Sequence, residues 1–231
     1  MENATKALEM AASVLIGVLI LAALLFGYSQ IAELKEIEQK NEKAKQLSDY
    51  NINFESYAKD KVYGSELLSL ANEIINYNER KATEESGYQK IELEVTMKEG
   101  IMLGQYFGAD NKTYSEEELN ESYRQLSSAI KNANEKSYGD KNIAYWSNVA
   151  GSSRTLSASS IIQLKKSLYN INEDGLTLTD SELSGFIEKI EKYNKLINEQ
   201  KDFARKTFKY VDIIEYNQGT GRVVKLTFSD K

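Results

Sequence analysis

The stretch Met10-Ala-Ala-Ser-Val-Leu-Ile-Gly-Val-Leu-Ile-Leu-Ala-Ala-Leu-Leu-Phe-Gly-Tyr-Ser-Gln-Ile-Ala32 decides how the chain is organised, because it contains no charged residue. At 1.5 Å per residue, a helix over this stretch is about 34 Å long, and the hydrocarbon core of a bilayer is about 30 Å thick. Tyr28 lies where aromatic side chains collect at the membrane interface. The sequence therefore predicts that residues 1–32 form a short tail and a transmembrane helix.

A cleaved secretory signal is the main alternative for this segment. Gly27 and Ser29 are small residues with the spacing of a signal-peptidase site. The tail is only weakly basic, however, since Lys6 is opposed by Glu2 and Glu9, and the helical pattern continues past Ser29. We therefore predict a retained single-pass anchor, with the lipid bilayer as its first partner.

The orientation of the anchor is predicted from two opposing signals. Cytoplasmic flanks carry an excess of Lys and Arg, and the larger number follows the span: Lys6 precedes it, and after it come Lys35, Lys40, Lys43 and Lys45. This count favours a cytoplasmic C-terminal domain. We nevertheless predict that the C-terminal domain lies on the extracytoplasmic side of the cell membrane, because a single span behind a short tail commonly acts as a signal anchor. The Asn-, Ser- and Tyr-rich body is also typical of a surface domain.

The composition excludes several kinds of active site. The chain of 231 residues contains no Cys, no His and no Pro. It therefore cannot form disulfides, thiol nucleophiles, His-based triads or metal sites with Cys or His ligands. Lys and Arg total 29 against 35 Asp and Glu, a net charge of −6, whereas a nucleic-acid-binding domain needs a basic face. We expect a non-enzymatic protein with no cofactor and no nucleic-acid partner.

Residues 33–62 are predicted to form an amphipathic stalk helix and a connection. Their apolar residues recur at three- and four-residue steps or sums of these, with Glu and Lys between them, which is the pattern of a helix with one apolar stripe. The stripe consists of Ile31, Leu34, Ile37, Ala44 and Leu47. No Gly or Pro lies between Tyr28 and Tyr63, so one helix is expected from about residue 4 to about residue 49.

Residues 63–231 are predicted to form an α+β domain in which helices cover a small antiparallel sheet. The pairs Ser115 with Glu118 and Thr179 with Glu182 have the spacing of capping boxes, which mark the starts of two helices. The predicted helices span residues 64–78, 116–134, 157–170 and 179–207. Residues 138–155, with two glycines and several serines, are predicted to be a loop.

The predicted strands follow from alternation of apolar and polar residues. Residues 91–97 alternate most clearly, and residues 101–107 are expected to return as a second strand after the turn at Gly100. A closing hairpin pairs residues 210–216 with residues 222–228. A lone hairpin is marginal in water, so we expect it to join residues 91–97 in one sheet.

One segment resembles a calcium-binding loop. Asn170, Asn172 and Asp174 supply oxygen ligands at alternate positions, as in the first half of an EF-hand. The twelfth position should be Glu, but it is Ser181, and Glu182 arrives one residue late. We therefore predict an Asx-rich turn without a metal.

Three other features were weighed as sites. Ser128 and Lys131 match a Ser-x-x-Lys pattern without its companion motifs, which favours an ordinary helix face. Trp146 is expected to pack in the core. Glu92 and Glu94 share one strand face and allow, as a second alternative, a hydrolase of envelope polymers that works with carboxylates alone.

Small residues in the apolar helix predict self-association. Ser13 and Gly17, and Ala23 and Gly27, are each separated by four positions, which lets helix backbones approach closely. Glu9 lies at the edge of the apolar stretch, where an acid is unfavourable unless it is paired. We expect Ser13, Gly17, Gly27 and Glu9 to be the contact residues if the helix binds a second copy.

The residues around Glu9 resemble the start of a pilin. The segment Ala4-Thr-Lys-Ala-Leu-Glu9-Met10, followed by Ala-Ala-Ser-Val-Leu-Ile, is similar to small Flp-type pilins. In those families the leader is cut after a small residue, and a cut after Ala4 would place Glu9 at mature position five. The resemblance implies that Glu9 pairs with the amino terminus of a neighbouring subunit. Ala4 departs from the usual Gly, Met10 departs from the usual Tyr, and the leader has no basic residue.

The chain also resembles small single-pass membrane proteins of Gram-positive bacteria that have no assigned activity. The similar motifs are Glu2-Asn-Ala-Thr-Lys-Ala-Leu8, Tyr63-Gly-Ser-Glu-Leu67, Asn76-Tyr-Asn78 and Gly221-Arg-Val-Val-Lys225. We therefore predict a membrane-anchored scaffold or binding domain of the cell envelope, whose partner is itself or another envelope protein. A pilin-like subunit is the first alternative.

Overall fold

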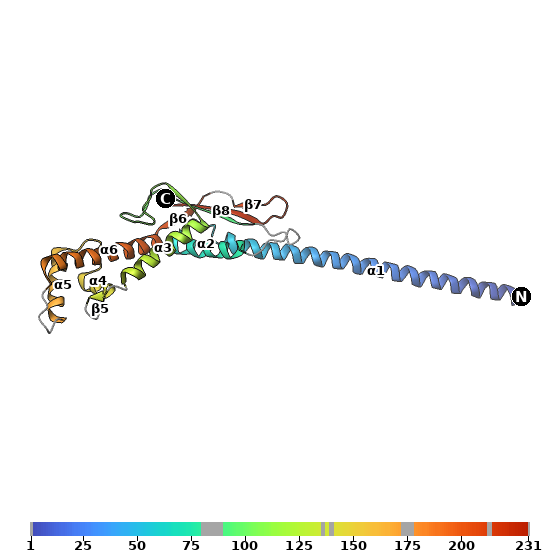
Figure 1. The fold of residues 1–231 in the computed structure, drawn as a ribbon. Coiled ribbons are helices and arrows are strands. Elements are labelled where there is room, and N and C mark those ends of the chain that lie inside the picture. Colours follow the sequence, from blue (N-terminus) through green and yellow to red (C-terminus); the bar gives the residue numbers. More distant parts are fainter. Residues whose placement is uncertain are drawn as a thin grey trace. The chain divides into compact units, whose positions relative to one another are not determined.

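The computed structural model describes residues 2–79, 90–134, 137–138, 141–171, 178–211 and 214–230, and Figure 1 shows their fold. The chain divides into two compact units, Met1–Ile52 and Asn53–Lys231. The elements are, in order, α1 (Glu2–Glu55), β1 (Val62–Tyr63), α2 (Gly64–Asn78), β2 (Glu92–Met97), β3 (Lys112–Ser115), α3 (Glu116–Asn134), β4 (Ser137–Tyr138), β5 (Lys141–Asn142), α4 (Ile143–Ala150), α5 (Ala158–Ile171), α6 (Asp180–Arg205), β6 (Thr207–Tyr210), β7 (Glu215–Tyr216) and β8 (Val223–Asp230).

The first unit is a single helix. α1 runs without interruption from Glu2, and an ion pair one turn apart, Glu36 with Lys40 at 2.7 Å, supports its polar part. Its apolar segment is not buried by any described residue, and by length and composition α1 can cross a membrane. The prediction of one long N-terminal helix is confirmed.

The second unit contains a six-stranded sheet in the order β1-β6-β8-β2-β3, with β7 also pairing with β8. β8 lies in the middle of the sheet, where Leu226 and Phe228 are fully buried. It pairs antiparallel with β6 and β7 and also pairs with β2, where Leu226 is the partner of Leu93. The prediction that the closing strands and residues 91–97 share one sheet is confirmed. The predicted strand over residues 210–216 is replaced by two short strands, since β6 ends at Tyr210 and β7 covers only Glu215–Tyr216.

The prediction of an antiparallel sheet is wrong for one pair, because β2 and β8 are parallel. The sheet is therefore mixed. Parallel neighbours need a long crossover connection, and the chain between β2 and β8 supplies one, since it passes through α3, α4, α5 and α6 before it returns. A prediction that paired strands by their proximity in sequence could not include this crossover.

The predicted strand over residues 101–107 is also wrong. The strand that returns beside β2 is β3, in which Tyr114 pairs with Val95. Residues 101–107 instead form an irregular loop, because the backbone amides of Gln105, Tyr106 and Phe107 donate hydrogen bonds to the side chain of Glu199. Amides used in this way are not available to a neighbouring strand.

The predicted helices over residues 64–78, 116–134, 157–170 and 179–207 are confirmed as α2, α3, α5 and α6. Both capping boxes are present. The amide of Glu118 donates to Ser115 Oγ, and the amide of Glu182 donates to Thr179 Oγ1. α2, α3 and α6 pack against one another, so the long helix α6 reaches from the sheet to α4 and α5 (Figure 1).

The predicted loop over residues 138–155 is wrong in its middle, where α4 forms. Asn142 caps its start by accepting a hydrogen bond from the amide of Tyr145 at 3.0 Å, and Gly151 ends it with a φ of 91°. Trp146 is fully buried and meets Phe186 edge to face, with the ring centroids 5.8 Å apart. The core-packing prediction for Trp146 is confirmed, and α4, α5 and α6 share a second apolar cluster around it.

Candidate functional site

The residues predicted for self-association all lie on α1, where Glu9, Ser13 and Gly17 are exposed and Gly27 is half-buried. Nothing lies within 4 Å of the position that a Cβ atom would occupy on Gly17 or Gly27. Ser13 Oγ donates back to the carbonyl of Met10 at 2.9 Å, and Glu9 is exposed to solvent. This stripe is open to a second helix, and self-association stays a prediction.

The other sites weighed from the sequence do not come together as catalytic centres in the described structure. The calcium-like segment lies mostly outside the described residues, and no group of three acidic side chains suited to a metal occurs among the described ones. Ser128 and Lys131 are exposed on α3. Glu94 shares the outer face of β2 with Glu92 and pairs with Lys225 at 2.9 Å.

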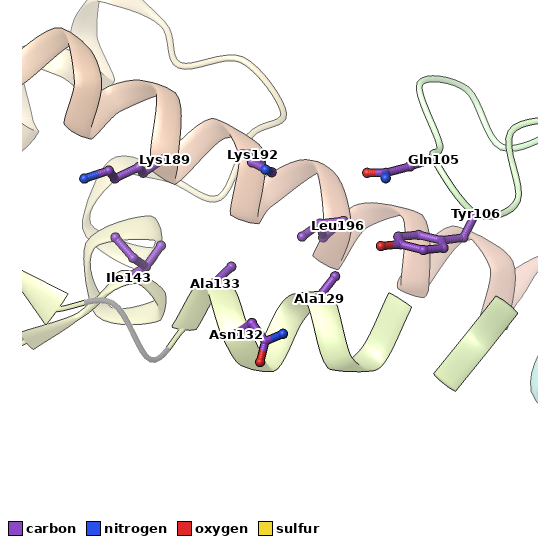
Figure 2. A pocket seen from close by; sticks show the side chains of 9 residues that line it. All are labelled: Gln105, Tyr106, Ala129, Asn132, Ala133, Ile143, Lys189, Lys192 and Leu196. Carbon is purple, nitrogen blue, oxygen red and sulfur yellow. The ribbon is translucent and has the colours of Figure 1, made fainter. Parts of the chain in front are cut away.

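A groove between α3 and α6 is a candidate binding site of the domain, and it was not predicted from the sequence. It has a volume of about 280 Å³. Its lining comes from α3, α6, the start of α4 and the loop before β3 (Figure 2). The nine lining residues are Gln105, Tyr106, Ala129, Asn132, Ala133, Ile143, Lys189, Lys192 and Leu196. We call this site the α3–α6 groove.

Helical periodicity explains the two long walls of the groove. On α6, Lys189, Lys192 and Leu196 are spaced by three and four residues, so they share one face. On α3, residues 129, 132 and 133 share a face for the same reason. Ala129 and Ala133 fill little space opposite Leu196, and the groove exists because these two positions on α3 carry methyl groups only.

The groove combines an apolar floor with a basic rim. Leu196 and Ile143 are buried in its floor, whereas Lys189 and Lys192 are exposed. Among the described residues, neither ammonium group forms an ion pair with a carboxylate. None of the lining residues is acidic. Sites that bind ligands are mostly apolar with a few placed polar groups, so the groove is suited to an anionic group attached to an apolar one.

The loop Ile101–Phe107 forms one end of the groove and is held in place by Glu199. The Glu199 carboxylate, only 2% exposed, accepts hydrogen bonds from the amides of Gln105 (2.9 Å), Tyr106 (2.6 Å) and Phe107 (2.7 Å). Hydrogen bonds to a charged acceptor are about twice as strong as neutral ones. Phe107 also stacks on Phe203 with the ring centroids 4.0 Å apart. Glu199 is one helical turn beyond Leu196, so the same helix fixes both the groove and the loop.

Close backbone approach inside this loop requires glycine at two positions. A Cβ atom on Gly104 would lie 2.8 Å from Glu199 Oε1, and one on Gly108 would lie 2.1 Å from the carbonyl oxygen of Gly104. The tip of the loop, directly before Gly104, is apolar and exposed: Met102 is 70% and Leu103 68% accessible. Leu103 has a φ of 61°, a left-handed conformation that is uncommon for residues other than Gly, Asn and Asp.

A second buried carboxylate fixes the start of the same segment. Asp230, at the end of β8, accepts hydrogen bonds from the amides of Lys98 (2.6 Å) and Glu99 (3.2 Å) and pairs with Lys206 Nζ at 2.7 Å. Burial by itself would raise the pKa of Asp230. The hydrogen bonds from Lys206, Lys98 and Glu99 outweigh it, and the pKa lies below its usual value. The exposed tip is therefore held by the protein core at both of its ends.

No family model, curated protein or solved structure matches this chain, so the chemistry of the groove rests on its own residues. The sequence contained partial signals for the α3–α6 groove and the loop beside it. The spacing of Lys189, Lys192 and Leu196 and the recurrence of Gly at positions 100, 104 and 108 are both visible in the chain. Neither signal indicates that α3 lies opposite α6.

Proposed function

We propose that this protein is a membrane-anchored, non-enzymatic binding domain of a bacterial cell envelope, with residues 53–231 on the extracytoplasmic side of the membrane. The observation that carries the proposal is the exposure of the apolar segment of α1, which no described residue covers. Covering such a surface is favourable by roughly 25 cal/mol per Å², and a bilayer supplies a cover of matching length. α1 then serves as the single-pass anchor.

The α3–α6 groove supports the binding part of the proposal. It offers an apolar floor, two ammonium groups that form no ion pair with a described carboxylate, and the side-chain amides of Gln105 and Asn132. These groups can hold a ligand. The groove lacks the two facing carboxylates that a carboxylate-dependent hydrolase requires, because none of its lining residues is Asp or Glu. Among the functions predicted from the sequence, it therefore supports a binding domain better than a hydrolase.

Two measurements on the full chain expressed in bacteria test this proposal. After carbonate extraction of membranes, the full chain is expected in the pellet. In intact cells, added protease is expected to remove a C-terminal tag while a cytoplasmic marker protein survives. A tag that is protected in intact cells and cleaved after lysis would show that the domain is cytoplasmic, and release into the carbonate supernatant would show that α1 is not an anchor.

A pilin-like subunit remains the second candidate, favoured by the stripe of Glu9, Ser13, Gly17 and Gly27 on α1, where nothing lies within 4 Å of a Cβ atom placed on either glycine. This candidate requires leader cleavage after Ala4 and pairing of Glu9 with a neighbouring amino terminus. N-terminal sequencing of the purified protein separates the two candidates. A mature chain that begins at Thr5 supports the pilin-like subunit, and an uncleaved chain supports the anchor alone.

A further inference from the structure

We propose that the α3–α6 groove and the tip formed by Met102 and Leu103 are one docking surface for a segment of another envelope protein, and that this segment carries acidic and large apolar side chains. The inference rests on the proposed function and names the partner chemistry of the same site. Three features of the surface carry it: its exposed apolar tip, its charge and its size.

The apolar tip has the properties of a preorganised anchor. Met102 and Leu103 are the exposed part of a loop whose flanks are buried and held by Glu199 and Phe107. A few large apolar residues supply most of the affinity of an interface, and a loop already fixed in its bound conformation loses little entropy on binding. The left-handed backbone conformation of Leu103 is strained, and these contacts maintain it. Strained backbone of this kind clusters at binding sites.

The charge of the groove selects an acidic partner. Lys189 and Lys192 stand on one face of α6 without an acidic neighbour in the lining, although the whole chain has a net charge of −6. Complementary charges steer association and fix the orientation of a bound segment. Figure 2 shows the order along α6: the two lysines come first, then Leu196, and then Gln105 and Tyr106 from the loop. Acidic side chains of the segment are expected at the lysine end and apolar ones at the loop end.

The size of the groove suits side chains of a bound segment. Pockets for drug-sized ligands enclose about 300–1,000 Å³, and this groove, at about 280 Å³, is at the lower end of that range. It has room for one or two large side chains while the rest of a segment lies along the rim. The exposed tip extends the contact beyond the groove, because Gln105 and Tyr106 belong to the same loop as Met102 and Leu103.

The experiment uses the full chain in nanodiscs of phosphatidylcholine, which is neutral. A phage-displayed library of random 12-residue peptides is panned against it, and the most enriched peptides are synthesised with a fluorescent label. We expect enriched peptides that combine Asp or Glu with Leu, Ile, Phe or Trp. Fluorescence anisotropy then gives the Kd of each peptide for the parent and for the variants.

The variants separate the groove from the rest of the surface. The double reversal Lys189→Glu with Lys192→Glu is expected to weaken binding at least about tenfold, and Ala129→Leu, which fills the groove, to weaken it similarly. Lys195→Glu makes the same charge change on an exposed residue of α6 outside the lining and is expected to change Kd less than about twofold. Thermal melting of each variant shows that it is folded.

The tip is tested with substitutions that keep its backbone conformation. Asn tolerates a left-handed φ, so Leu103→Asn removes the apolar side chain without adding strain. Together with Met102→Gln it is expected to weaken peptide binding about tenfold. A Kd that these tip variants leave unchanged would restrict the docking surface to the groove and overturn its proposed extent.

Other outcomes overturn the docking proposal while leaving the proposed function intact, because carbonate extraction and protease access are measured separately. Enriched basic peptides, peptides that bind the groove variants as well as the parent, or no enrichment would each do so. Saturable binding of dihexanoyl phosphatidylglycerol that depends on the two lysines, with no peptide enrichment, would assign the groove to a lipid. A dimer in detergent that the double reversal dissociates would assign it to a second copy of this chain.

Discussion

The apolar side chains of α1 and those of α2 have the same chemistry and opposite surroundings. In α1, Leu15, Leu19 and Leu24 are 64%, 60% and 65% exposed. In α2, Leu67 and Leu70 are fully buried. Residues 53–231 therefore bury an apolar core of their own, whereas the apolar segment of α1 is not covered by any described residue. The two units thus differ in what surrounds their apolar side chains.

Buried charge differs between the two units in the same way. The domain buries Glu199 and Asp230 and satisfies each with backbone amides, and Asp230 also with Lys206. The described carboxylates of α1 are instead exposed or half-buried. Buried carboxylates are tolerated only when they are hydrogen-bonded or paired. The domain uses them to fix the loop beside the groove, whereas the carboxylates of residues 2–52 lie on an exposed surface.

The largest effect is expected from deleting the exposed apolar segment of α1, which removes the difference between the two units. A chain that lacks residues 1–32 is expected to move completely from the membrane pellet to the soluble fraction and to be monomeric, because the apolar span is gone while the domain retains its core. Ultracentrifugation of cell lysates and sedimentation of the purified protein measure this. A chain without these residues that still pellets after carbonate treatment would contradict the assignment of α1 as the anchor.

The next effect is loss of the sheet core at β8. Leu226→Ala and Phe228→Ala are each expected to lower the free energy of unfolding by about 2–5 kcal/mol, since each removes a fully buried side chain and leaves a cavity. Lys225→Ala, which loses only a partly exposed ion pair with Glu94, is the control and should lose less than about 1 kcal/mol. Urea denaturation followed by circular dichroism measures all three.

A truncation tests the same strand more severely. Deleting residues from Asn217 onward removes β8, which lies between β6 and β2 in the sheet. The shortened chain is expected to aggregate or to be degraded. If it instead melts cooperatively near the temperature of the parent, β8 is an accessory to the fold.

Asp230→Asn tests a buried carboxylate of the domain and is expected to lower the free energy of unfolding by about 3 kcal/mol at neutral pH, because it leaves Lys206 unpaired. The pKa of Asp230 is lowered in the folded state. Its stabilisation is therefore present above the unfolded pKa of about 3.9 and is lost as the pH falls through the folded pKa. When the free energy of unfolding is measured from pH 7 to pH 3, it should fall less in the variant than in the parent.

Glu199→Gln tests the carboxylate that holds the loop. The amide keeps the shape of the side chain but loses the charge and presents an NH₂ group where a second oxygen accepted a hydrogen bond. The expected loss is about 2 kcal/mol, together with faster amide hydrogen exchange at Gln105, Tyr106 and Phe107. Gln200→Glu, at the next position on α6, is the control for a Glu/Gln exchange. Unchanged exchange at the three amides would contradict the role given to Glu199.

The smallest effect concerns Tyr216, whose hydroxyl donates to Glu55 Oε1 at 2.8 Å. Burial and this hydrogen bond to Glu55 raise the pKa of Tyr216 to about 12. The protonated phenol is favoured in the folded state, so its contribution is present below about pH 10 and is lost as the pH rises through about 12. Tyr216→Phe is expected to lower the free energy of unfolding by under about 1 kcal/mol. Glu55→Gln should bring the pKa of Tyr216, followed by NMR of labelled tyrosine, back toward 10.

The sequence predicted those parts of the fold that local patterns control. Capping boxes at Ser115 and Thr179 located the starts of α3 and α6, and alternation located β2. Predictions were wrong where a local signal was ambiguous. The glycine and serines around α4 looked like a loop, although Asn142 and Gly151 are its two caps. Residues 101–107 were predicted as a strand because they follow β2 and the turn at Gly100.

By itself, the sequence determined that α1 is one long apolar helix, that chemistry based on Cys or His is absent, and where most helices of the domain begin. Each of these depends on composition or on residues within a few positions of one another. Only the tertiary structure decided the parallel pairing of β2 with β8, the buried position of Glu199 and the α3–α6 groove. The groove joins Tyr106, Ala129, Ile143 and Lys189. These residues are far apart along the chain, and they meet only because α3 and α6 pack against each other.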